Sequence, residues 1–371
     1  MSTRAEQVLN RPLTLGSAKI PNRLAMAPMT RMHSPGGIPG PDVAAYYARR
    51  AAAGTGLIIT EGTYIGHPTA GESDQVPRFA GTEQLQGWDR VVQQVHAAGA
   101  AIMPQLWHIG IQRTAGAPPF TDAPSVGPSG IALDGTTGAG TALNLSDIDA
   151  LIASFAQAAA QAEHLGFDGV ELHGAHGYLI DQFLWERTNH RTDSYGGDPL
   201  SRTRFAADIV EAVREKVSAD FPVLLRFSQW KADHYHAQIA PTPEDLDTVL
   251  APLARAGVTA LHASGRRYWE PAFPESDPDL NIAGWAKKVT GLPAITVGSV
   301  GLDGVFAPDR LGRSAEVTGI DALLDRLEAE EFDMVAVGRA LLADPAWAEK
   351  VMSGRGDDLI AYTKDAVRTL H

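Results

Sequence analysis

Short apolar runs alternate eight times with longer amphipathic runs along this chain, and this alternation constrains the fold more than any other feature. The apolar runs have the length and composition of buried strands and cover residues 24–27, 57–60, 101–106, 169–172, 223–227, 258–262, 294–297 and 334–337. Strands that alternate with helices indicate a parallel sheet covered by those helices. Eight units predict closure into a barrel rather than an open sheet. We therefore expect an α/β chain with one (β/α)8 TIM-barrel domain over residues 1–371.

The amphipathic runs carry apolar residues at the spacing of a helix. They predict helices over residues 85–98, 148–165, 205–217, 246–256 and 320–330. Three of them are preceded by a hydroxyl residue with an acid three positions later, which is close to a capping box. These pairs are Ser146 with Asp149, Thr242 with Asp245 and Thr318 with Asp321.

Two connections are too long to be plain loops, and both follow strands. Residues 115–145 are rich in Pro, Gly, Ser and Thr, which suits either a lid or a variable surface insertion. Residues 266–280 contain Tyr268, Trp269 and Phe273. Because loops after barrel strands lie over the C-terminal face, we expect both loops to cap that face. The clustered aromatic residues favour a pocket wall in the second loop.

Composition excludes several classes of protein. Lys and Arg number 31 and Asp and Glu number 44, a net charge of −13, which argues against nucleic acids and anionic membranes as partners. With no cysteine, disulfides, thiolate nucleophiles and Cys-ligated metals are excluded. No run of about 18 apolar residues is present, so no membrane-spanning helix is expected. Residues 1–11 lack the apolar core of a signal peptide, so the expected location is the cytoplasm.

The strand at 169–172 is followed by His173, His176 and Tyr178. Glycines at 174 and 177 allow sharp turns, so the three rings can crowd one small volume. Neutral donors at a strand end are suited to grip a carbonyl and deliver a proton. Two alternatives are a pair of core histidines and a metal site completed by His108 or His234. The metal site is disfavoured because no carboxylate lies at a recognisable spacing.

Polar residues also follow the other predicted strands. Gly298-Ser299 and Gly338-Arg339 follow the seventh and eighth strands, where barrels commonly hold a phosphate. Lone glycines often only make turns, but the arginine adds a cation suited to phosphate oxygens. Arg226 lies on an apolar strand and needs an anion. That anion is either Glu61 or Glu171 in a salt bridge, or a cofactor that becomes negative on reduction. Gln105 either pairs with a flat heterocycle or is a core glutamine bonded to the backbone.

Together these residues resemble the Old Yellow Enzyme family of FMN-dependent ene-reductases, over essentially the whole chain. The motifs that carry the resemblance are NRLAMAPMTR at 22–31, ITEG at 59–62, QLWH at 105–108, HGAHGYL at 173–179, RTDSYGG at 191–197, LR at 225–226, GS at 298–299 and VGR at 337–339. Any one of them is weak evidence. Their order, on the predicted strands of one barrel, is specific.

The resemblance implies that residues at the strand ends hold FMN. They are Ala27, Pro28, Met29, Thr30, Gly62, Gln105, Arg226, Gly298, Ser299, Gly338 and Arg339. Thr30 is implied to hydrogen-bond flavin O4, and Arg226 is implied to lie beside flavin N1 and O2. The last four residues are implied to grip the phosphate. The chain is thus expected to be a single FMN-binding barrel domain.

The resemblance also implies a ping-pong reaction through flavin N5. NADPH or NADH gives hydride to the flavin and leaves, and an enone, enal or nitroalkene is then reduced at its activated C=C bond. The carbonyl or nitro oxygen is implied to lie between His173 and His176, which stabilise the developing charge. Tyr178 is implied to protonate the α-carbon. The expected partners are small molecules, and the protein is expected to be a monomer or a homo-oligomer.

The sequence departs from the family pattern around the substrate. Glu72 follows Gly71 where many members have Tyr, and Trp185-Glu186 replaces a more usual Ser-Pro or Asp-Pro pair. The C-terminal aromatic residue that some members place near the flavin is not assured, because the chain ends soon after Tyr362. The expected substrate-binding residues are Trp107, Glu72, Tyr268 and Trp269.

Two other functions fit part of the pattern. A non-redox phosphate-binding TIM-barrel enzyme, such as an aldolase or isomerase, would use the same phosphate loops, but no strand lysine suggests a Schiff base. A catalytically idle flavin-binding protein would need His173, His176 and Tyr178 to be core rings. Bound flavin and turnover of an enone distinguish these possibilities.

Overall fold

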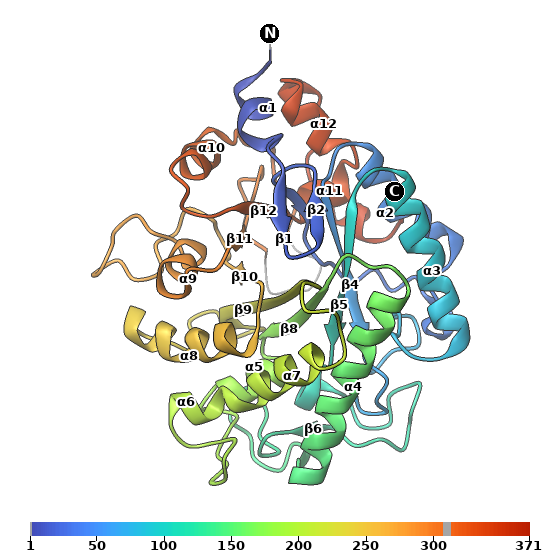
Figure 1. Cartoon of the computed structure of the whole chain (residues 1–371), viewed down its shortest axis with the longest axis vertical. Coiled ribbons are helices and arrows are strands. Elements are labelled where there is room, and N and C mark those ends of the chain that lie inside the picture. The colour runs from blue at the N-terminus through green and yellow to red at the C-terminus, as the bar shows by residue number, and fades with distance from the viewer. Residues whose placement is uncertain (1, 307–312) are drawn as a thin grey trace.

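The computed structural model describes residues 2–306 and 313–371 and contains a closed parallel barrel of eight strands (Figure 1). Its strands are β3 (Leu24–Met26), β4 (Leu57–Tyr64), β5 (Ala101–Trp107), β8 (Val170–His176), β9 (Val223–Lys231), β10 (Ala260–Ser264), β11 (Ala294–Val297) and β12 (Met334–Val337). The barrel closes where β12 pairs with β3, with Val335 opposite Leu24. The predicted (β/α)8 fold is confirmed.

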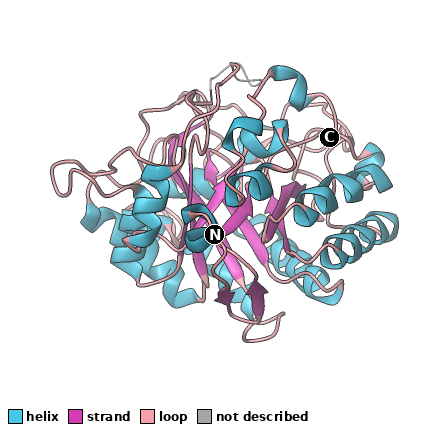
Figure 2. Ribbon diagram, turned by 90° about the horizontal axis from the view of Figure 1, so that it is seen from above, coloured by secondary structure: helices cyan, strands magenta, loops and turns pink. Residues whose placement is uncertain are grey.

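Helices surround the strands, as Figure 2 shows from above. The α-helices are α1 (Arg4–Leu9), α2 (Pro41–Ala52), α3 (Thr82–Ala97), α4 (Leu145–His164), α5 (Leu179–Leu184), α6 (Pro199–Arg202), α7 (Arg204–Arg214), α8 (Pro243–Ala256), α9 (Ile282–Thr290), α10 (Asp321–Glu328), α11 (Arg339–Ala343) and α12 (Trp347–Met352). Short 3-10 helices cover Pro35–Gly37, Gly110–Gln112, Gly356–Asp358 and Lys364–Val367. Among the described residues, no helix is long and apolar enough to cross a bilayer.

A hairpin of β1 (Leu13–Leu15) and β2 (Ala18–Ile20) packs against the apolar interior of the barrel. Its turn residue Gly16 has a φ of +52°, and a Cβ there would lie 2.1 Å from the carbonyl oxygen of Asp220. Glycine is therefore required for this contact. Since Asp220 precedes β9, the hairpin closes the N-terminal end of the barrel, and the opposite end remains for polar side chains.

The strands that carry the predicted site residues His173, His176 and Arg226 are longer than the sequence pattern indicates. β8 continues past residue 172 to His176, and β9 continues past residue 227 to Lys231. The two extensions pair with each other, with His176 opposite Lys231 and an irregularity between Gly174 and His176. Cross-strand pairing of this kind stabilises polar residues in a strand that local composition does not predict.

One predicted cap is confirmed and two are wrong. Thr242 and Asp245 form a capping box at the start of α8. The cap of α4 is Asn144 with Asp147, because the Asn144 side chain accepts the N–H of Asp147 and the Asp147 carboxylate accepts the N–H of Asn144. This leaves no capping role for Ser146 and Asp149. α10 begins after Ile320 with no side-chain cap, so Thr318 does not cap Asp321.

The long loop after β5 has structure of its own. Residues 115–145 include two short paired strands, β6 (Val126–Gly127) and β7 (Thr141–Ala142). Arg113, at the start of the loop, donates to the carbonyl oxygens of Gly71, Thr114, Ala117, Phe120 and Ala123. One buried guanidinium thus replaces the regular hydrogen bonds that the loop backbone lacks.

Candidate active site

A cavity of about 640 Å³ opens at the C-terminal ends of the strands. Most of the predicted site residues line it: Ala27, Pro28, Met29, Thr30, Gly62, Glu72, Gln105, Trp107, His173, His176, Tyr178, Arg226, Gly298, Ser299, Gly338 and Arg339. They come from seven of the eight strand ends, so no segment of the chain forms this cavity by itself. The barrel therefore brings motifs that are far apart in the sequence together in one site.

The three predicted rings lie together at the end of β8. The ring centroids of His173 and Tyr178 are 4.8 Å apart, and those of His173 and His176 are 5.2 Å apart. Trp107, from the end of β5, lies 4.9 Å from Tyr178 and stacks at 6.0 Å on His173. The backbone turns here because His176 and Gly177 have φ values of +64° and +80°. The left-handed region is costly for His176, and such strain persists only where neighbouring contacts hold it.

Both histidines are neutral near physiological pH. Burial, reinforced by the positive charge of Arg226, holds the pKa of His173 and of His176 well below the usual range of histidine. A neutral imidazole donates one hydrogen bond and accepts another. The Nδ1 atom of His173 is buried and has no hydrogen-bond partner among the described residues. It is therefore available to a ligand in the cavity.

Ser264, at the end of β10, fixes the second histidine. Its Oγ lies 2.8 Å from Nε2 of His176 and accepts a hydrogen bond from Nη2 of Arg226 at 3.2 Å. A hydroxyl oxygen can accept two hydrogen bonds, so Ser264 can either donate to Nε2 or accept from it; because arginine only donates and the described residues offer the Ser264 proton no other acceptor, we assign Ser264 as the donor. That assignment leaves the ring proton of His176 on Nδ1. Trp230 supports the arrangement, since its ring stacks on His176 at 4.2 Å and its Nε1 donates to the Ser264 carbonyl at 2.8 Å.

The guanidinium of Arg226 is buried without an acid. No carboxylate of the described chain lies within 4 Å of it. Glu171 instead accepts from His262 at 2.6 Å and from Gln105 Nε2 at 2.8 Å, and Glu61 accepts the N–H of Arg31 at 2.8 Å. The salt bridge considered from the sequence is therefore wrong.

Two further observations concern the hydrogen bonds of the Arg226 and Gln105 side chains. Burial lowers the pKa of Arg226, and its Nε has no hydrogen-bond partner in the described part of the chain. A buried cation in this state favours an anionic ligand. The amide nitrogen of Gln105 is bonded to a carboxylate and not to the backbone, so the core-glutamine alternative is also wrong.

A second cation, Arg339, follows β12 and also has an N–H group without a hydrogen-bond partner in the described residues. Arg339 Nη2 donates to the carbonyl oxygen of Gly304, whereas its Nη1 is buried and has no partner in the described residues. Gly298 and Ser299 adopt φ values of +148° and +48°, which turn the backbone sharply after β11. A Cβ at Gly338 would meet nothing closer than Met29 Sδ at 3.6 Å. These residues fit the phosphate site predicted from the sequence.

Several residues that line the cavity were not predicted. They are Arg31, Met32, Tyr64, Ser73, Trp230, Tyr235, Ser264, Arg266 and Tyr362 among others. Tyr362 comes from the C-terminal segment, and its ring lies 5.5 Å from the guanidinium of Arg339. An aromatic residue near the chain end is thus present at the site. The aromatic content of 230–235 is the signal that could have found Trp230 and Tyr235.

The structure does not bring four predicted residues to the cavity. Tyr268 is buried and its carbonyl accepts from Asn281 at 2.7 Å, and Trp269 is 38% exposed; neither lines the cavity. The pocket wall predicted from this loop comes from Arg266 instead. His108 bonds to Thr69, and His234 packs on Trp185. No group of three His, Cys, Asp or Glu residues in the described chain could hold a metal.

Glu72 lines the cavity with its carboxylate tied to the long loop. Its Oε2 accepts from the N–H and from the hydroxyl of Thr114, both at 2.9 Å. The Glu72 N–H points toward the hydroxyl of Tyr64 at 3.4 Å. Glu72 therefore joins the cavity to Thr114, directly before residues 115–145, none of which line the cavity.

Comparison with known proteins gives a consistent result. The sequence model of the NADH:flavin oxidoreductase / NADH oxidase family matches residues 8–308. The chain is 32% identical to 12-oxophytodienoate reductase 7 of Oryza sativa subsp. japonica, covering 93% of this chain and 88% of that protein. It is 34% identical to an NADH oxidase of Thermoanaerobacter brockii over 93% of this chain. It spans only 50% of the length of that relative.

A solved structure supports the same relationship. Morphinone reductase in complex with tetrahydroNAD superposes with a TM-score of 0.77 at 30% sequence identity. The match covers 97% of this chain and 93% of the other. Similarity over nearly the whole of both chains includes the barrel and the loops at its C-terminal face.

Proposed function

The chain belongs to the NADH:flavin oxidoreductase / NADH oxidase family, which includes the Old Yellow Enzymes, and is FMN-dependent; we propose that it reduces the activated C=C bond of α,β-unsaturated carbonyl or nitro compounds with hydride from NAD(P)H. The observation that carries the proposal is the convergence of two neutral imidazoles and a phenol in one cavity. The names of two relatives, an oxophytodienoate reductase and morphinone reductase, refer to ketones.

The residues of the cavity fit FMN. Two cations, Arg226 and the half-buried Arg339, each have a buried N–H group without a hydrogen-bond partner among the described residues, and they suit an anionic ring edge and a phosphate. We assign Ala27, Pro28, Met29, Thr30, Gly62 and Gln105 to the ring, and Gly298, Ser299, Gly338 and Arg339 to the phosphate. FMN held by these residues would supply hydride transfer from NAD(P)H to the alkene. The whole chain is then one FMN-binding domain.

His173 and His176 bind the carbonyl or nitro oxygen of the substrate. Each has one ring N–H, and burial keeps both rings neutral, so they donate hydrogen bonds without donating a full proton. As hydride reaches the β-carbon, negative charge develops on the substrate oxygen, where these donors stabilise it. One donor of this kind typically contributes about 10²–10³ in rate.

Tyr178 delivers the proton that completes the reaction. Its ring lies 4.8 Å from His173 and 4.9 Å from Trp107, so it shares the volume in which the substrate oxygen is held. The phenol O–H protonates the α-carbon as the oxygen–carbon double bond re-forms. Trp107 and Glu72 line the same cavity and are proposed to contact the rest of the substrate.

The test is anaerobic turnover of FMN-loaded protein with NADPH and 2-cyclohexenone. One cyclohexanone, identified by gas chromatography, is expected for each NADPH consumed. NADPH consumption without saturated product would contradict ene-reduction while leaving a flavin oxidoreductase. Absence of bound FMN would favour the non-redox phosphate-binding barrel.

A further inference from the structure

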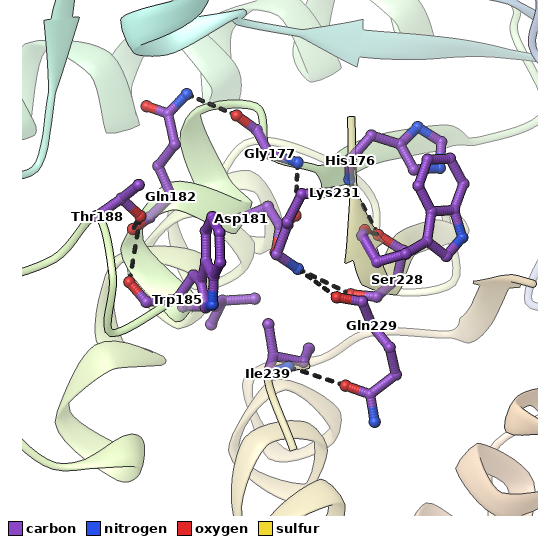
Figure 3. Close-up of polar contacts among 12 residues, drawn as sticks. His176, Gly177, Asp181, Gln182, Trp185, Thr188, Ser228, Gln229, Lys231 and Ile239 are labelled. Atoms are coloured by element: carbon purple, nitrogen blue, oxygen red, sulfur yellow. Dashed lines mark hydrogen bonds and ion pairs between the residues drawn. The ribbon is translucent and has the colours of Figure 1, made fainter. Parts of the chain in front are cut away.

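A buried ion pair lies directly behind the turn that carries the catalytic rings (Figure 3). Lys231, the last residue of β9, and Asp181, in α5, are 2.9 Å apart and both side chains are fully buried. The Lys231 ammonium also donates to the carbonyl oxygens of Ser228 at 3.2 Å and Gln229 at 2.9 Å. The ring of Trp185 lies 5.7 Å from the same ammonium. The Trp185 side chain therefore covers this pair.

The backbone of the turn is held at every polar group. The His176 N–H donates to Ser228 Oγ at 3.0 Å, and the His176 carbonyl accepts from Ala232 at 3.2 Å. The Gly177 N–H donates to Asp181 Oδ2 at 2.7 Å. The Gly177 carbonyl accepts from two glutamine side chains, Gln112 and Gln182. Because His176 has a left-handed φ of +64°, such contacts are what keep it in place.

Lys231 links the two sets of contacts. Through Asp181 it holds the amide of Gly177, and through the carbonyl of Ser228 it holds the residue whose hydroxyl binds the amide of His176. A buried ion pair contributes little net stability compared with apolar residues of the same size. A role in fixing one local geometry is the better explanation for its presence here.

We propose that Lys231 and Asp181 are positioning residues, which fix the turn so that the His176 ring meets the substrate oxygen. The proposal rests on the proposed function. Neither side chain lines the cavity, so both act through the backbone of the turn. Loss of the pair is expected to weaken carbonyl binding without changing FMN binding.

The central variant is Lys231→Met/Asp181→Asn in the FMN-loaded protein. A single substitution leaves one buried charge without its partner and can prevent folding. The double variant leaves no charge, and the amide introduced by Asp181→Asn keeps an oxygen for the Gly177 N–H. Lys231→Arg keeps a cation and N–H donors and is expected to retain most of the wild-type affinity. A control with the same substitutions is Lys287→Met/Asp333→Asn, at a partly exposed pair 3.0 Å apart beside the N-terminal ends of β11 and β12.

The first readout is the Kd of cyclohexanone, a ketone that cannot be reduced at C=C, measured from flavin absorbance. The double variant is expected to lose about tenfold in ketone affinity, within the 10²-fold that a misplacement of about 1 Å can cost. Its FMN affinity, and the ketone affinity of the control variant, are expected to match wild type. Wild-type ketone affinity in the double variant would overturn the proposal.

The second readout is hydrogen exchange of the peptide amides over residues 173–180. Exchange is expected to be faster in the double variant and unchanged in the control variant. This measurement does not depend on catalysis. If wild-type protein neither binds ketones nor reduces enones, the proposed function fails, and unchanged exchange in the double variant then overturns the positioning role separately.

Discussion

Replacing Arg226 by Met is expected to stabilise the apoprotein and to weaken FMN binding. Arg226 is 7% exposed, its Nε is unpartnered among the described residues, and its guanidinium donates to Ser264 at 3.2 Å. A buried charged group with unmade hydrogen bonds costs about 1–3 kcal/mol or more. The attraction of nearby Glu171 offsets part of this cost. The apoprotein of Arg226→Met is therefore expected to gain about 1 kcal/mol in free energy of unfolding.

The holoprotein is expected to change in the opposite direction. If Arg226 donates to the flavin, the Arg226→Met substitution removes a charged hydrogen bond worth about 1.5–3 kcal/mol, which is about 10- to 10²-fold in FMN affinity. Urea unfolding of the apoprotein and fluorescence titration with FMN measure the two effects. Arg339→Met serves as a comparison at the proposed phosphate end of the cavity. An apoprotein that loses stability, or an unchanged FMN affinity, would refute the reasoning that Arg226 is kept for a ligand.

Three other substitutions test separate parts of the site. Tyr178→Phe is expected to slow alkene reduction by about 10²–10⁴-fold and to leave flavin reduction by NADPH nearly unchanged; equal losses in stopped-flow half-reactions would exclude the phenol as proton donor. In wild-type protein, ¹⁵N NMR is expected to find the His176 proton on Nδ1, and Ser264→Ala is expected to weaken ketone binding by about 1 kcal/mol; a wild-type proton on Nε2 would contradict the assignment. Burial raises the pKa of Glu61 to about 7 from 4.5. Because the folded state favours the neutral form of Glu61, the protonated carboxyl contributes to the free energy of unfolding below pH 4.5. About 3 kcal/mol of this contribution is lost as the pH rises to 7. The Tm difference between wild type and Glu61→Gln should change over this pH range, and a constant difference would show that Glu61 does not titrate there.

The barrel and most of the site could be predicted because their signals are local. Each strand is a short apolar run, and the residue that follows it reaches the C-terminal face by the geometry of the fold. Pro28, Gly62, Gln105 and Gly338 line the cavity for this reason alone. The chain order of strands and helices is therefore enough to predict that the functional residues lie at the strand ends.

The parts that could not be predicted depend on contacts between distant segments. Ser264 and Trp230 lie beyond the apolar runs that predicted their strands; Ser264 pairs with Val297 of β11, and Trp230 precedes Lys231, which pairs with His176 of β8. Lys231 lies beyond the predicted strand at 223–227, and its partner Asp181 is 50 residues earlier in the chain, so no local pattern indicates the pair. Trp269 was predicted in the pocket from aromatic clustering, yet nothing in residues 266–280 states which side of the loop faces the barrel.

The most direct test of the account is the visible spectrum of the FMN-loaded protein during anaerobic addition of NADPH and then 2-cyclohexenone. The account predicts that the yellow colour bleaches with NADPH and returns with one equivalent of the enone. Bleaching that the enone does not reverse would contradict alkene reduction in this cavity, and protein that remains colourless after FMN is added would contradict the cofactor site.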